Sequence, residues 1–251
     1  MTTHMILGDT QCKSGIHLEY MSALGKYAAE LKPDVIVSIG DHWDFPSLSF
    51  YDKGKLDAEG RRLVDDLASG HEGMARFMTP IWETQAAQQR AKKKIWDPRL
   101  VFTAGNHEDR FDRMARDNPE YAGMFGLEAL DIEKYGFEVY PYLKPVDIDG
   151  IFYTHFLANP FTGKPYGGTA ANQLKHVGRS FVVGHKQVLD VNIRPTIDGK
   201  MQLGIINGAC YLHDEKYKGF QGNNHFRGFT VLRNVADGYG DPEFVSLRSI
   251  M

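Results

Sequence analysis

Five places in the sequence carry an acidic, amide or imidazole side chain directly after a short apolar run. They are Gly8-Asp9, Gly40-Asp41, Gly105-Asn106-His107, Thr154-His155 and Gly184-His185. In open α/β sheets, ligands bind beyond the carboxyl ends of the strands, where glycine lets the backbone turn sharply. We therefore expect five strand ends to converge on one site.

The donor atoms in this set indicate divalent metal ions. Carboxylate and amide oxygens are hard ligands and imidazole is a borderline one, so the set suits Mn²⁺, Fe²⁺, Zn²⁺ or Ni²⁺. Two ions roughly 3.5–4 Å apart can share one carboxylate and one hydroxide, and can clamp the attacking and leaving oxygens of a displacement at phosphorus. The pattern predicts metal-dependent hydrolysis of a phosphate ester.

The elements that must position these residues follow from hydrophobic periodicity. Met5–Leu7, an amphipathic stretch over residues 16–31 and Val35–Ile39 predict a strand, a helix and a second strand, with Pro33 ending the helix. A strand, helix, strand unit gives parallel strands. The next segment, around residues 58–96, is rich in helix-forming residues and predicts two helices interrupted at Pro80, as a cap-like insertion.

The second half of the chain changes to short β-type runs. We predict strands at 137–140, 146–148, 151–154, 181–183, 202–206, 229–232 and 244–247, with one helix at about 169–176. Helical units followed by strand-rich sequence predict an α/β fold in which two mixed β-sheets pack together between helices. Without repeats or a linker, residues 1–251 are expected to form a single domain.

In chain order, these motifs resemble the signature of the calcineurin-like metallophosphoesterase superfamily. The runs Gly8-Asp9, Gly40-Asp41-His42-Trp43-Asp44, Gly105-Asn106-His107-Glu108, His155 and Gly184-His185 match D-x-H, GDxxD, GNH[DE], H and GHxH. The resemblance covers the chain from Asp9 to Gln187, and it implies a four-layer αββα sandwich. Within the superfamily, the chain is similar to members encoded by phages and prophages.

The resemblance also implies the metal ligands. Asp41 matches the ligand that bridges two ions, and Asp9 matches a ligand of the first ion. The ligands of the second ion match Asn106, His155 and His185.

Three further residues match catalytic positions of the superfamily. His107 matches the general acid or transition-state stabiliser, and Asp44 matches the carboxylate that orients it. Arg110 resembles the arginine that binds phosphoryl oxygens in the protein-phosphatase branch. Alternatively, Asp44 caps a turn and Arg110 forms a surface salt bridge.

The chain departs from the pattern at two imidazoles of the first metal, where it has Gln11 and Gln187. Two amides give a weaker and harder site, which should prefer Mn²⁺ or Mg²⁺; alternatively, each glutamine supports a ligand without touching the ion. His213 and His225 lie in polar, glycine-flanked segments and are candidates for the same site. Arg227 is a candidate for binding phosphate, or for packing on its neighbouring phenylalanine.

We therefore expect a metallophosphoesterase with two divalent ions, Mn²⁺ first, with Fe²⁺, Zn²⁺, Ni²⁺ or Mg²⁺ as alternatives. The preferred function is a phosphodiesterase or nuclease that acts on nucleic acid or nucleotides. One alternative is a phosphomonoesterase resembling Ser/Thr protein phosphatases, because of Glu108 and Arg110. The other is a degenerate, non-catalytic module that binds a phosphorylated ligand or a partner.

Composition bounds the partners and the compartment. The formal net charge of -3 gives no global basic field of the kind that duplex-wrapping proteins use. Cys12 and Cys210 lie far apart and suggest reduced thiols. No apolar run approaches the roughly 20 residues that span a bilayer, and no signal peptide is recognisable. A cytoplasmic protein is expected, in the host cytoplasm if a phage encodes it.

Overall fold

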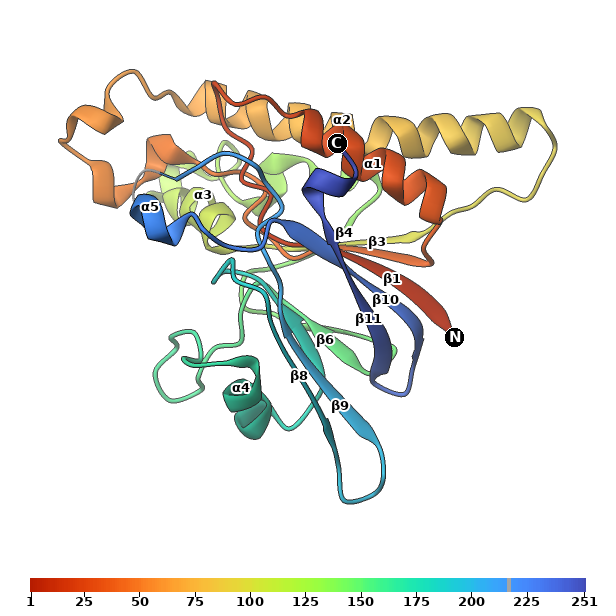
Figure 1. The fold of residues 1–251 in the computed structure, drawn as a ribbon. Helices are drawn as coiled ribbons and strands as arrows, with labels where there is room; N and C mark the ends of the chain where they lie inside the picture. The colour runs from red at the N-terminus through yellow and green to blue at the C-terminus, as the bar shows by residue number, and fades with distance from the viewer. Residues whose placement is uncertain (216–217) are drawn as a thin grey trace.

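The computed structural model describes residues 1–215 and 218–251, which form two β-sheets packed face to face between helices (Figure 1). The larger sheet has the order β11-β10-β1-β2-β3-β4 and the smaller one the order β5-β6-β7-β9-β8. The strands of the larger sheet are β1 Thr2–Leu7, β2 Val35–Ser38, β3 Arg99–Thr103, β4 Glu138–Tyr140, β10 Gly228–Ala236 and β11 Tyr239–Ser246. Those of the smaller sheet are β5 Val146–Ile148, β6 Ile151–Tyr153, β7 Phe181–Val183, β8 Asp190–Pro195 and β9 Met201–Ile206.

Both sheets are mixed. Strands β1 to β4 are parallel to one another, whereas β10 runs antiparallel to both β1 and β11. In the smaller sheet, β6, β7 and β9 are parallel, and β5 and β8 are antiparallel edge strands. The parallel pairs at the centre are buried on both faces, so that every residue of Val35–Ser38 is buried.

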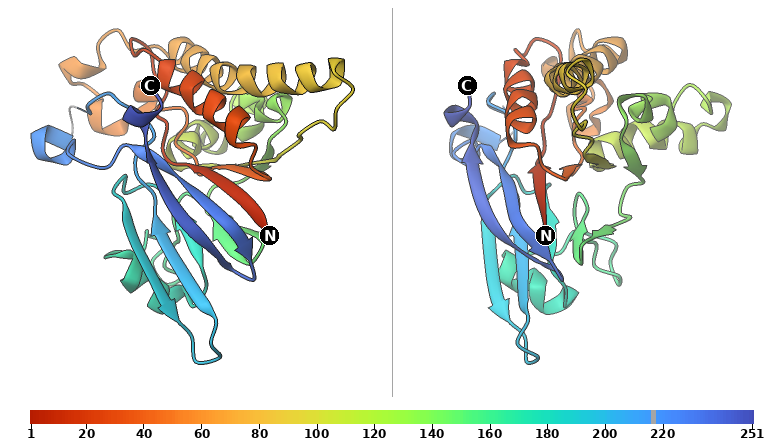
Figure 2. Two further views of the ribbon diagram at one scale, coloured as in Figure 1. Left: turned by 45° about the vertical axis from the view of Figure 1, so that its right-hand side comes forward. Right: turned by 90° about the vertical axis from the view of Figure 1, so that its right-hand side faces the viewer.

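Apolar side chains fill the space between the sheets and beneath the helices on each side. Ile6, Val37 and Val101 of the larger sheet share one core cluster with Tyr153 and Ile205 of the smaller sheet. Helices α1 (Glu19–Leu31) and α2 (Leu63–Arg90) cover the outer face of the larger sheet, and α4 (Ala170–Val177) covers that of the smaller one (Figure 2). The remaining helices are α3 (Asn106–Asp117) and the short α5 (Gly219–Gly222). The predicted four-layer αββα sandwich is therefore confirmed.

Helix α2 corrects the prediction of two helices divided at Pro80. It is one continuous helix of 28 residues with Pro80 inside it. An internal proline costs about 3 kcal/mol, but each large apolar side chain buried contributes about 1.5–3 kcal/mol. Phe77 and Met78 before the proline and Ile81 after it are all buried in the core shared with α1, so burial on both sides maintains the helix. This segment thus belongs to the main core.

Replacing Gly25 of α1 with alanine is expected to destabilise the protein by roughly 1–2 kcal/mol. Alanine favours a helix by about 1 kcal/mol over glycine, but overpacking costs about 1–3 kcal/mol. A Cβ at Gly25 would lie 2.1 Å from the carbonyl oxygen of Phe77, a backbone atom of α2 that cannot turn away. Urea unfolding measures the change, with the exposed Lys26→Ala as the control on the same helix. A Gly25→Ala midpoint equal to or above that of the unsubstituted protein would show that the helices can separate freely.

Candidate metal centre

The five strand ends predicted from the sequence lie at the same end of the sandwich. Asp9 follows β1, Asp41 follows β2 and Asn106 opens α3 after β3. His155 and His185 follow the neighbouring strands β6 and β7 of the other sheet, and the Gly184 N–H donates to the His155 carbonyl at 2.9 Å. The site therefore forms where the carboxyl ends of the two sheets meet.

Four side chains converge there. The Asn106 Oδ1 atom lies 2.9 Å from His155 Nε2 and 2.8 Å from His185 Nδ1. Asp41 Oδ2 lies 3.3 Å from His155 Nε2, and the ligand atoms of Asp41, His155 and His185 all lie within 4.8 Å of one another. Carboxylate, amide and imidazole donors gathered so closely are a chemically suitable set for one divalent ion.

Hydrogen bonding fixes the orientation of His155. Its Nδ1 lies 2.8 Å from the carbonyl oxygen of Ile39, an acceptor, so Nδ1 carries the proton and Nε2 faces the cluster. Burial alone would lower the pKa of His155, but the charge of Asp41 raises it to about 9. Burial likewise opposes the ionisation of Asp41, whose pKa His107 and His155 nevertheless hold well below its usual range. This concentration of negative charge and lone pairs favours a cation.

The backbone of the centre adopts conformations that non-glycine residues rarely take. Asp41 and His185 have φ values of 50° and 66°, in the left-handed region. Such strained residues concentrate at functional sites, where the surrounding structure must hold them. The turn at Asp41 also needs Gly105, because a Cβ there would lie 2.2 Å from Asp41 Oδ1.

Glu108 holds these turns together from beneath. Its carboxylate accepts the backbone N–H groups of His42 and Trp43 on Oε1 at 2.8 and 3.0 Å, and those of Asp41 and Gly105 on Oε2 at 2.9 and 2.8 Å. Its side chain is fully buried. Glu108 therefore braces the turns of the ligand cluster, and this role had no signal in the sequence beyond its motif position.

Glu108→Gln should lower the free energy of unfolding by roughly 2–4 kcal/mol. The glutamine amide would direct an NH₂ group at two backbone N–H donors, and each buried donor without an acceptor costs about 1–3 kcal/mol. Thermal or urea unfolding in the presence of a chelator measures this loss without a contribution from metal binding. The exposed Glu83→Gln on α2 is the matched control. Equal stability of both variants would contradict the bracing role.

His107, Asp44 and Arg110 lie together beside the cluster. His107 Nδ1 is 3.0 Å from Asp44 Oδ1 and 2.6 Å from the Asp44 carbonyl oxygen. His107 Nε2 lies 3.6 Å from Asp41 Oδ2 and accepts a 2.9 Å hydrogen bond from Arg110 Nη2. Burial lowers the pKa of His107, but Asp41 and Asp44 outweigh it and raise the pKa above its ordinary value. The imidazole can therefore hold a proton next to the cluster.

A charged chain that sequence reasoning missed extends from Asp44 to His213. Lys13 Nζ lies 3.1 Å from Asp44 Oδ2 and also binds Glu215, which accepts a 2.8 Å hydrogen bond from His213 Nε2. His213 thus contacts Glu215 and not the cluster of candidate ligands. Lys13 and Glu215 are 202 residues apart, so no local pattern could pair them.

The other two late candidates lie in the same segment. His225 Nδ1 lies 3.1 Å from the Gly222 carbonyl oxygen, and its ring packs edge-on against Tyr211 at 6.0 Å. Arg227 donates to the carbonyl oxygens of Leu212 and His213 and to the Asp214 carboxylate. In this arrangement Arg227 braces the loop over residues 212–214.

At the first metal position, Asp9 and Gln187 are hydrogen-bonded to each other. Asp9 Oδ1 accepts the His185 N–H at 3.1 Å, and Asp9 Oδ2 accepts Gln187 Nε2 at 2.7 Å. Gln187 Oε1 accepts the Tyr211 hydroxyl at 2.7 Å and the Lys218 ammonium. Gln11 is fully buried, and neither of its amide atoms has a hydrogen-bond partner in the described ranges 1–215 and 218–251.

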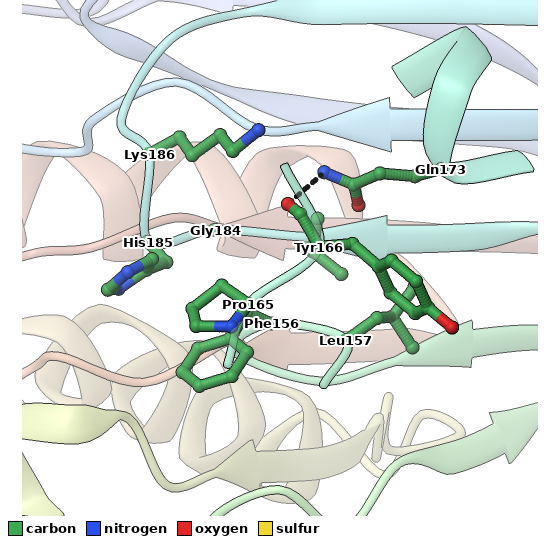
Figure 3. Close-up of a pocket in the computed structure, with 9 residues that line it drawn as sticks. Phe156, Leu157, Pro165, Tyr166, Gln173, Gly184, His185 and Lys186 are labelled. Carbon is green, nitrogen blue, oxygen red and sulfur yellow. Dashed lines mark hydrogen bonds between the residues drawn. The ribbon is translucent and has the colours of Figure 1, made fainter. Parts of the chain in front are cut away.

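A small cavity adjoins His185 (Figure 3). Phe156, Leu157, Pro165 and Tyr166 form its apolar wall, and Lys186 lies at its edge. Its volume of about 10 Å³ holds roughly one water molecule. It is too small for a substrate. Among the described helices, none is both long and apolar enough to cross a membrane.

Comparison with known proteins agrees with this geometry. The family model for calcineurin-like phosphoesterases matches residues 3–200. The chain is also similar to the Gene 54 protein of Mycobacterium phage D29, with 27% identity over 187 residues that cover 72% of this chain and 67% of the phage protein. The Gene 54 protein of Mycobacterium phage L5 is 25% identical, with the same coverage. The chain is thus a phage-type member of the calcineurin-like phosphoesterase family, whose activity is metal-dependent hydrolysis of phosphate esters.

Proposed function

We propose that this protein is a metal-dependent phosphodiesterase that cleaves nucleic acid or nucleotides. The observation that carries the proposal is the convergence of Asp41, Asn106, His155 and His185 next to His107. Metal ligands alone could serve a structural ion, but a protonatable imidazole 3.6 Å from the Asp41 carboxylate adds a group that can transfer a proton.

Each of these residues has a defined task in the proposed reaction. Asp41, Asn106, His155 and His185 would hold divalent metal, which lowers the pKa of water and neutralises charge on phosphoryl oxygens when bound. The carbonyl oxygen and the carboxylate of Asp44 accept hydrogen bonds from His107 Nδ1, at 2.6 and 3.0 Å, and so direct Nε2 at the cluster. From there, His107 can protonate the leaving oxygen.

Arg110 would change partners when substrate binds. Its guanidinium donates to His107 Nε2 at 2.9 Å and to the Asp44 carbonyl oxygen at 3.4 Å. A phosphoryl oxygen is a stronger acceptor than a neutral imidazole, since charge-assisted hydrogen bonds are about twice as strong as neutral ones. Transfer of Arg110 to the phosphate would free His107 Nε2 to carry a proton.

Exposed aromatic side chains support a nucleic-acid substrate over a phosphoprotein. Phe50 and Tyr51 are 85% and 83% exposed in the segment that follows Asp44, and Lys53 Nζ lies 5.5 Å from the Phe50 ring centroid. Aromatic side chains next to cationic ones bind unpaired bases by stacking, at about 1–3 kcal/mol per base. The alternative, a phosphomonoesterase, is favoured by Arg110, because a guanidinium suits the dianionic end of a monoester.

Turnover of paired substrates tests the proposal. With Mn²⁺ added, bis(p-nitrophenyl) phosphate should be hydrolysed faster than p-nitrophenyl phosphate, and single-stranded DNA or RNA should be cleaved. Faster hydrolysis of the monoester would establish the monoesterase instead. If neither ester is hydrolysed with Mn²⁺, Fe²⁺, Zn²⁺, Ni²⁺ or Mg²⁺, the chain is a non-catalytic binding module. Asp41→Asn provides the blank for contaminating phosphatases.

A further inference from the structure

The first metal position has a side chain whose orientation does not suit an ion. Gln187 points its amide nitrogen at Asp9, at 2.7 Å, and its amide oxygen at the Tyr211 hydroxyl and Lys218. An amide nitrogen has no free lone pair for a metal, and the oxygen already accepts two hydrogen bonds. Gln187 therefore offers no ligand atom to an ion at Asp9.

Both carboxylate oxygens of Asp9 also accept hydrogen bonds. Its Oδ1 accepts the backbone N–H of His185, which helps to hold the strained turn of that residue, and its Oδ2 accepts Gln187. Among the described residues, the cluster of potential ligands contains Asp41, His155 and His185 but not Asp9. The two halves of the centre thus differ. The donor atoms of Asp41, Asn106, His155 and His185 face one another, whereas Asp9 is hydrogen-bonded to Gln187 and to the His185 backbone.

Lys218 supplies a positive charge at the first metal position, next to Gln187. Its ammonium donates to Gln187 Oε1 and, at 2.9 Å, to the Tyr211 hydroxyl. Burial opposes the charged form of Lys218, whereas the charges of Asp9 and Glu215 favour it. Tyr211 and Gln187 are 0% and 4% exposed, so the groups that hold the ammonium are fixed by the core. A partly buried ammonium needs such acceptors and a carboxylate nearby.

We propose that Lys218 takes the place of the first metal ion, so that the centre binds a single divalent ion, on Asp41, Asn106, His155 and His185. The covalently attached ammonium balances the charge of Asp9 through Gln187, and it repels a second cation from the same position. The two glutamines and the lysine then form one concerted replacement. This proposal rests on the proposed function in one respect, namely that Asp41, Asn106, His155 and His185 bind a divalent ion.

Gln11 differs from Asp9 and Gln187 at this position. Its amide is buried, and within the part of the chain that the structure describes it makes no hydrogen bond. Each buried polar group without a hydrogen bond costs about 1–3 kcal/mol, so the fold carries a cost at Gln11.

Counting Mn²⁺ tests the proposal directly. The unsubstituted protein, saturated with Mn²⁺, should retain one ion per chain in native mass spectrometry and give the six-line electron paramagnetic resonance spectrum of an isolated Mn²⁺. The triple variant Gln11→His, Gln187→His and Lys218→Met should bind two ions per chain and give a spin-coupled spectrum. Lys218→Arg, which keeps the charge, and Lys175→Met, which removes an exposed lysine on α4, should both bind one ion.

Each result either supports or overturns the replacement. Two coupled ions in the unsubstituted protein would overturn it, and this measurement needs no variant to fold. A folded triple variant that still binds one ion would also overturn it, because Lys218 would not be what excludes the first ion. Ester hydrolysis measured in parallel separates the two proposals. One ion without hydrolysis contradicts the phosphodiesterase alone, and hydrolysis with two ions contradicts the lysine replacement alone.

Discussion

Asp41→Asn should abolish ester hydrolysis and lower bound Mn²⁺ together. Asp41 is the carboxylate of the ligand cluster, and its Oδ2 lies 3.3 Å from His155 Nε2 and 3.6 Å from His107 Nε2. Asparagine keeps the shape but removes the negative charge, and it can present an NH₂ group to the ion. Loss of a group that merely supports a ligand costs about 10–100-fold in metal affinity, so loss of the ligand charge should cost at least 10²-fold.

The measurement is Mn²⁺ titration by isothermal calorimetry together with turnover of a diester. The matched control is Glu30→Gln, which removes one carboxylate charge from an exposed position on α1. Both variants should unfold cooperatively, since Asn at 41 can still accept the backbone N–H of His107 that Asp41 Oδ1 accepts at 2.9 Å. Full turnover in Asp41→Asn, with metal retained, would show that Asp41 is not a metal ligand.

The cluster of candidate metal ligands was predictable from the sequence because each ligand is part of a local sequence pattern. Each ligand follows a short apolar strand and a tight turn, and parallel strands end at the same edge of a sheet. The chain order of strands and ligands therefore predicted that Asp41, Asn106, His155 and His185 would meet. Their distances in the structure agree with that expectation.

The other half depended on long-range contacts that no local pattern records. The motif position of Gln187 predicts a candidate ligand. Its amide orientation, however, is set by Tyr211 and Lys218, 24 and 31 residues further along the chain. Lys13 and Glu215 likewise meet only in the folded protein. Side-chain rotation is decided by tertiary partners, so the sequence could identify the position and not the contact.

Two elements of the fold escaped prediction for comparable reasons. Strand β8, Asp190–Pro195, is an edge strand whose residues are half-buried or exposed, so it lacks the dense apolar run by which buried strands are recognised. In α2, propensity at Pro80 predicted a break, and tertiary burial of its neighbours outweighed it. Local preference is a weak guide where packing on both sides determines the conformation.

His107→Ala should lower turnover by about 10²–10⁴-fold on an ester with a poor leaving group, which is the usual contribution of a positioned general acid. Mn²⁺ affinity should stay unchanged, because His107 lies beside the ligand cluster and its backbone N–H to Asp41 Oδ1 remains in the variant. The control is His17→Ala, since His17 has a side chain that is 96% exposed.

The leaving group distinguishes proton transfer from a structural effect of losing the ring. A p-nitrophenolate leaves without being protonated, so His107→Ala should lose much less activity on bis(p-nitrophenyl) phosphate than on a dinucleotide, whose alkoxide must take up a proton. The acid role requires this difference, because Asp44 directs Nε2 at the position where the leaving oxygen would lie. An equal loss on both esters would instead assign His107 to transition-state charge stabilisation or to the shape of the site, and turnover as fast as that of His17→Ala would exclude any part in the reaction.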